Sequence, residues 1–102
     1  MENKQQELQA MLEQLLGSRN VYYQPPESLQ MKYPAIRYEL DTIDSRNADN
    51  IKYSKNNRYT ITVMDRLPDN EVISKILDLP YSSYDRRYNS SNLVHDVITL
   101  YY

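Results

Sequence analysis

Two short segments of the chain follow a period of two, and this periodicity constrains the fold more than any other feature. Residues 35–40 read AIRYEL and residues 58–64 read RYTITVM, so every second side chain is a large apolar or aromatic one. Successive side chains of a strand point to opposite faces of a sheet, so each segment is expected to be a strand with one buried face. The chain is therefore expected to form a sheet that is covered on one side.

Two other segments have the spacing of amphipathic helices. Residues 3–16 place Met11 and four leucines at intervals of three and four, which gives one apolar stripe. Gly17, the only glycine, follows directly, where a left-handed residue commonly ends a helix. A second apolar stripe in residues 71–77 follows the polar sequence PDN, which predicts a capped helix start, and this helix is expected to end before Pro80.

The remaining segments complete the predicted order of elements. Residues 21–33 contain two adjacent prolines and lead to a third, so they are expected to form an ordered extended arm. Residues 81–88 and 93–102 are predicted strands joined by a turn over residues 89–92. The order helix, strand, strand, helix, strand, strand predicts a single α+β domain over residues 1–102. In it, a mostly antiparallel four-stranded sheet carries two helices packed on one face.

Composition argues against several functional classes. The 102 residues carry a net charge of −2 with no basic stripe, which argues against sequence-specific DNA binding. The chain has no cysteine for a disulfide or a thiolate site, and one glycine cannot build the known phosphate-binding loops. The N-terminal MENKQQEL lacks the features of a signal peptide and no apolar run is long enough for a membrane span, so a soluble protein is expected.

The few candidate catalytic or metal-binding residues have simpler structural explanations. His95 is the only histidine and lies beside Asp96, but neighbouring residues of a strand face opposite sides of the sheet. No serine lies in a nucleophile elbow. Asp41, Asp44 and Asp49 lack the ligand spacing of a calcium loop. We therefore expect no enzyme, no cofactor and no metal site.

Cations and aromatic rings alternate in one segment. Tyr84, Arg86, Arg87 and Tyr88 could stack on bases and contact phosphates. Asp85 lies among them, however, and the segment is short. A salt-bridged strand is the favoured interpretation, and nucleic-acid binding is the alternative.

The longest polar segment, residues 41–57, is expected to contact a neighbouring subunit. It is rich in Asn, Asp and Ser, contains an apolar pair and carries both signs of charge. A connection of this length inside a compact domain is usually functional or disordered. The residues expected to make the contact are Arg46, Asp49, Ile51, Lys52, Tyr53 and Lys55.

Three stretches together resemble a known family. They are VYYQPPESLQMKYPAIRYEL in residues 21–40, RYTITVMDRLPDNEVISKIL in residues 58–77 and YDRRYNSSNLVHDVITLYY in residues 84–102. In these, the chain resembles the tail terminator, or tail completion, proteins of long-tailed bacteriophages. The resemblance covers most of the chain beyond the first predicted helix, and none of its motifs is catalytic.

The resemblance implies a small α/β subunit that forms a six-membered ring on the head-proximal end of the tail tube. Such a ring stops tube growth and offers the surface to which the neck attaches. Its partners would be copies of itself, the tail tube protein and the head-completion protein, with genomic DNA passing through without sequence-specific binding. The protein would reside in the virion tail or neck, and in the host cytoplasm during assembly. Another neck protein, such as a head–tail stopper, is the alternative within the same class.

Overall fold

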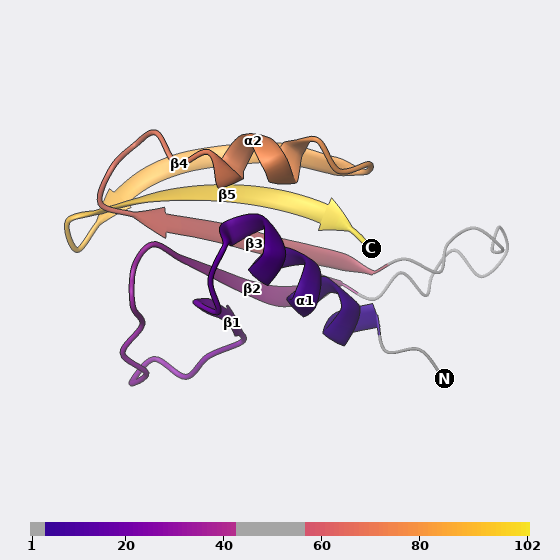
Figure 1. Ribbon diagram of the computed structural model, residues 1–102, viewed down its shortest axis with the longest axis horizontal. Helices are drawn as coiled ribbons and strands as arrows, with labels where there is room; N and C mark the ends of the chain where they lie inside the picture. Colours follow the sequence, from indigo (N-terminus) through magenta and orange to yellow (C-terminus); the bar gives the residue numbers. More distant parts are fainter. Residues whose placement is uncertain (1–3, 43–56) are drawn as a thin grey trace, which may run out of the picture.

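The computed structural model describes residues 4–42 and 57–102, which form a five-stranded sheet and two helices (Figure 1). The elements are α1 (Lys4–Leu16), β1 (Val21–Tyr23), β2 (Ala35–Thr42), β3 (Arg58–Asp65), α2 (Val72–Leu77), β4 (Ser82–Ser90) and β5 (Leu93–Tyr101). The strands lie side by side in the order β1, β2, β3, β5, β4.

The sheet is mixed, which corrects the predicted four-stranded antiparallel one. Strands β2 to β5 pair antiparallel as neighbours in the sheet, but β1 runs parallel to β2, with Val21 beside Ile36. The backbone N–H of Gln24 donates to the carbonyl of Tyr38 at 2.8 Å and continues this pairing. The prolines placed residues 21–23 in the predicted extended arm, and three residues before a proline pair are too few to show a period of two. The α+β class is confirmed.

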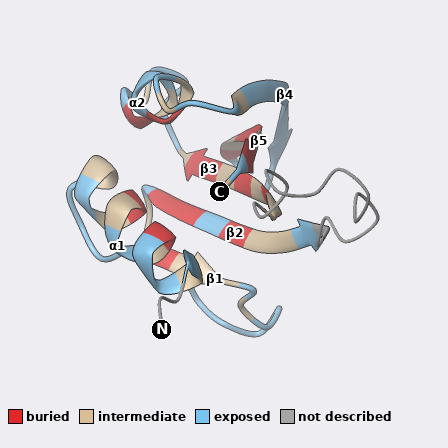
Figure 2. Ribbon diagram, turned by 90° about the vertical axis from the view of Figure 1, so that its right-hand side faces the viewer, coloured by how far each residue is buried: buried red, intermediate tan, exposed pale blue. Residues whose placement is uncertain are grey.

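Both helices cover the same face of the sheet, which gives one core (Figure 2). The alternating residues predicted for β2, β3 and β5 supply the sheet side of it, as expected from their period of two. The buried members of the core are Leu8, Leu12, Val21, Ile36, Tyr38, Tyr59, Ile61, Val63, Val72, Ile76, Ile98 and Leu100. The prediction of two helices on one face is therefore confirmed.

Local chemistry sets the helix boundaries. Gly17 has φ of 84° and its N–H donates to the carbonyl of Glu13 at 2.9 Å, so it ends α1 as predicted. Asn70 Oδ1 accepts a hydrogen bond from the N–H of Val72 at 2.9 Å and satisfies a donor in the first turn of α2. The predicted polar start of α2 is confirmed.

Strand β4 is the outer strand beside β5, and its shape depends on a turn and a bulge. Ser91 and Asn92 have positive φ values of 54° and 63°. A two-residue hairpin loop with a type I′ turn requires positive φ at both positions. The turn is thus shorter than predicted, and β4 continues to Ser90. The register shifts between Tyr84 and Arg86, so Asp85 is an extra residue that bulges out of the pairing.

Candidate functional site

The six residues expected to contact a neighbouring subunit or the tail tube lie outside the described residues. They are Arg46, Asp49, Ile51, Lys52, Tyr53 and Lys55. The surface features below come from residues 4–42 and 57–102 alone.

His95 and Asp96 lie on opposite faces of the sheet, as the alternation of a strand requires. His95 pairs with Met64 and Tyr88 on the face without helices, and its ring stacks on Tyr88 with centroids 4.6 Å apart. Asp96 pairs with Val63 on the helix-covered face. The two side chains therefore do not form one acid–base site.

Asp96 is a buried carboxylate with complete hydrogen bonding. Arg87 Nε donates to Oδ1 at 2.7 Å, Arg87 Nη2 donates to Oδ2 at 3.3 Å, and the Tyr84 hydroxyl donates to Oδ1 at 2.6 Å. Tyr84 and Arg87 are three residues apart and would face opposite sides of a regular strand. The bulge at Asp85 brings both onto the face of Asp96.

This cluster also connects the outer strand to the loop before α2. Arg87 Nη2 donates to the carbonyl of Pro68 at 2.9 Å. The hydrogen bonds to Asp96 raise the pKa of Arg87 and raise the pKa of Tyr84. The Arg87 guanidinium thus stays charged and the Tyr84 phenol stays neutral. The role of the cluster is structural, because it holds β4 against β5 and the loop before α2.

The alternating cations and aromatic rings of β4 are divided between the two faces. Arg87 is bound to Asp96, while Arg86 forms an ion pair with Asp85 at 2.9 Å and lies 5.7 Å from the ring of Tyr88. Each cation therefore has a carboxylate partner, which reduces the charge available to a phosphate backbone. This geometry matches the interpretation of a salt-bridged strand.

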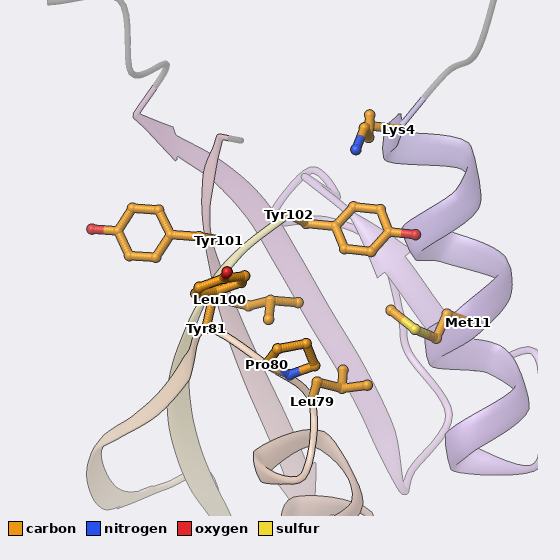
Figure 3. A pocket seen from close by; sticks show the side chains of 8 residues that line it. All are labelled: Lys4, Met11, Leu79, Pro80, Tyr81, Leu100, Tyr101 and Tyr102. Carbon is orange, nitrogen blue, oxygen red and sulfur yellow. The ribbon is translucent and has the colours of Figure 1, made fainter. Parts of the chain in front are cut away.

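An apolar groove lies between α1 and the ends of β4 and β5 (Figure 3). Its volume is about 260 Å³. Figure 3 shows Met11 reaching from α1 towards Leu79 and Pro80, with Tyr102 above them. The residues that line it are Lys4, Met11, Leu79, Pro80, Tyr81, Leu100, Tyr101 and Tyr102.

Charged side chains contact Tyr102, one of the residues that line this groove. Lys4 Nζ lies 5.4 Å from the centre of the Tyr102 ring, and the Tyr102 hydroxyl donates to Glu7 Oε1 at 3.4 Å. The Tyr101 N–H donates to the Tyr81 carbonyl at 3.1 Å and holds the two chain segments of the floor together. The groove is therefore an apolar hollow with Lys4 in its lining and with Glu7 bonded to the hydroxyl of Tyr102, another lining residue.

A second apolar feature is the loop between β3 and α2. Leu67 at its tip is 68% exposed, although the loop itself is held by side-chain hydrogen bonds. Asp65 Oδ1 accepts from the Leu67 N–H at 3.2 Å, and Asp65 Oδ2 accepts from Asn70 Nδ2 at 2.8 Å. With the Arg87 contact to Pro68, these bonds display an exposed leucine on an ordered loop.

Tyrosines supply most of the remaining exposed aromatic surface. Tyr81, Tyr84, Tyr88 and Tyr101 are 72%, 45%, 40% and 40% exposed, and all lie on or beside β4 and the end of β5. A tyrosine ring offers a large rigid contact area and a hydroxyl that remains hydrated, so this residue is enriched in protein interfaces. Tyr84 lies on the helix-covered face and Tyr88 on the other face, so these rings expose aromatic surface on both sides of this edge of the sheet. The edge formed by β4 and the end of β5 is therefore a candidate interaction surface.

The sequence analysis missed the groove and the Leu67 loop. The groove joins residues from the two ends of the chain, which no local pattern brings together. Leu67 had a local signal, because this isolated leucine between Arg66 and Pro68 lies beyond the alternating segment 58–64 and before the helical stripe of residues 71–77.

Comparison of the chain with protein-family models, with curated proteins and with solved structures finds no match. Within the described ranges, neither helix has the length and apolar character needed to cross a membrane. Nor do three histidine, aspartate or glutamate side chains converge there on a point where a metal ion could bind.

Proposed function

We propose that this protein is a tail terminator subunit of a long-tailed bacteriophage, which forms a ring on the head-proximal end of the tail tube. The sequence resemblance in residues 21–40, 58–77 and 84–102 suggests this class. The structural observation that carries the proposal is the group of exposed tyrosines on and beside the outer strand β4, Tyr81, Tyr84, Tyr88 and Tyr101. A small domain with so much exposed aromatic surface is suited to association with other subunits.

The mechanism is steric. A ring of copies bound to the last ring of the tube occupies the surface to which the next tube subunit would add, so polymerisation stops. The opposite side of the ring remains free to bind the neck. The net charge of −2 gives the ring little attraction for DNA that passes through its centre.

The outer strand is suited to specific rather than indiscriminate association. A long unpaired strand edge can pair with any other edge, and bulges and charged residues limit this. In β4 the bulge at Asp85 and the ion pair between Asp85 and Arg86 interrupt the edge at its middle. Contacts through the tyrosine side chains are then favoured over continuous strand pairing.

The test is polymerisation of the tail tube protein in the presence of the purified chain. We expect tubes to become shorter as the concentration of the chain rises, with the chain bound at one end only. Tyr88→Ser should weaken this effect, whereas Leu29→Ser, which changes a residue that is 41% exposed and lies away from β4, should not. Tubes of unchanged length would count against the proposal. Binding to the neck without any effect on tube length would favour a head–tail stopper.

A further inference from the structure

We infer that Leu67 of one subunit inserts into the apolar groove of the next subunit, so that the subunits join head to tail. This inference rests on the proposed ring-forming function and identifies the contact that builds the ring. The groove borders on Met11, Leu79, Pro80 and Tyr102.

The exposed leucine and the groove match in size and apolar character. Leu67 is 68% exposed, and its loop is fixed by Asp65 and Asn70, so little conformational entropy remains to be lost on docking. The groove has a volume of about 260 Å³. An apolar cavity of about 150 Å³ is large enough to hold benzene, so the groove has room for a leucine side chain.

Both features have charged residues close by. Asp65, Arg66 and Asp69 lie within two residues of the exposed leucine. Lys4 lines the groove, and Glu7 accepts a hydrogen bond from Tyr102, which also lines it. When the leucine enters the groove, Asp69 can face Lys4, and Arg66 can face Glu7. Opposite charges at the edge of a contact fix its orientation and disfavour other partners.

The Leu67 loop and the groove lie at opposite ends of the sheet. Strand β3 begins at Arg58 beside Tyr101, near the groove, and ends at Asp65 beside Val94, just before the Leu67 loop. Figure 1 shows the loop from β3 to α2 at one end of the molecule and the C-terminus at the other. A contact between different patches of identical subunits forms a ring when the rotation closes.

The test uses single cysteines, because the chain has none of its own. Two full-length variants, Leu67→Cys and Met11→Cys, carry tags of different size and are mixed in equal amounts. A short bis-maleimide then cross-links cysteines that lie close together. The matched control replaces Leu67→Cys with Leu29→Cys, a second exposed leucine. We expect about tenfold more 67–11 product than 29–11 product, because docking of the two subunits holds position 67 beside position 11 at a high effective concentration.

A chain that carries both Leu67→Cys and Met11→Cys should give a ladder of covalent oligomers. A ladder that stops at two subunits, or a yield of 67–11 product no higher than that of the 29–11 control, overturns the inference. Tail capping by the unmodified protein is measured separately. If tails are capped without the 67–11 product, this contact is wrong and the proposed function stands; if the product forms without capping, the contact stands and the proposed function fails.

Discussion

Arg87 in β4 donates hydrogen bonds to both carboxylate oxygens of Asp96 in β5, at 2.7 and 3.3 Å. Asp96 is 2% exposed and is the buried charged residue of the described chain. A buried carboxylate needs such partners, because its desolvation is costly unless charge and hydrogen bonds compensate. The pair therefore ties the outer strand β4, which carries two of the exposed tyrosines, to its neighbour β5.

Arg87→Ala is expected to lower the free energy of unfolding by about 1 to 3 kcal/mol, because Asp96 would lose its charged partner while remaining buried. Arg86→Ala is the matched control, since Arg86 pairs with Asp85 at the exposed surface and should change stability by less than about 0.5 kcal/mol. Urea unfolding of both variants measures the difference. Equal effects of the two substitutions would contradict the role assigned to Arg87.

Leu12→Ala is expected to lower the free energy of unfolding by about 2 to 5 kcal/mol. Leu12 is fully buried between α1 and the sheet, so truncation of its side chain leaves a cavity. Leu29→Ala, at a residue that is 41% exposed, should cost much less. Thermal unfolding followed by circular dichroism compares the two. An unchanged melting temperature for Leu12→Ala would show that α1 does not pack as described.

Stability should fall at high pH through Tyr38. Burial raises the pKa of Tyr38 to about 12 from its usual 10.0. The folded state binds the phenolic proton more tightly than the unfolded state does. The stabilisation of the folded state that comes from this difference in proton affinity is therefore complete below about pH 10. It is lost as the pH rises through 12. The hydroxyl donates to Gln9 Oε1 at 2.6 Å and accepts from Gln5 Nε2 at 2.7 Å, which ties β2 to α1.

Tyr38→Phe isolates this contribution. The stability difference between the wild-type chain and the variant should shrink by about 2 kcal/mol between about pH 9 and pH 12. Urea unfolding at a series of pH values measures it, and the ultraviolet absorbance of the phenolate reports the titration itself. A difference that stays constant over this range would exclude a raised pKa at Tyr38.

Much of the fold could be predicted because its signals are local. The period of two in residues 35–40 and 58–64 marks the buried face of β2 and β3, and the apolar stripe of residues 3–16 marks α1. Gly17 and Asn70 act at helix ends through their own backbone or side chain. The parallel strand β1 was missed because its partner, β2, lies beyond the proline-containing connection and three residues carry no period.

The surface was less predictable, because it depends on residues that come together only in the fold. A single extra residue, Asp85, decides which face Arg87 occupies, and sequence alone does not locate such a bulge. The groove joins Met11 to Tyr102 across nearly the whole chain. The contact residues expected in the long polar segment, such as Arg46 and Tyr53, lie outside the described residues and stay a prediction.

Electron microscopy of phage tails is the most direct measurement of the central claim. It compares tails made in cells in which the coding sequence of this chain is intact in its native genome with tails made in cells from which that sequence has been deleted. The account predicts that tails made without it are overlong, variable in length and not joined to heads. Supplying the chain should restore uniform tails, with label at the head-proximal end alone. Tails of normal length joined to heads in its absence, or label elsewhere on the particle, would contradict the account.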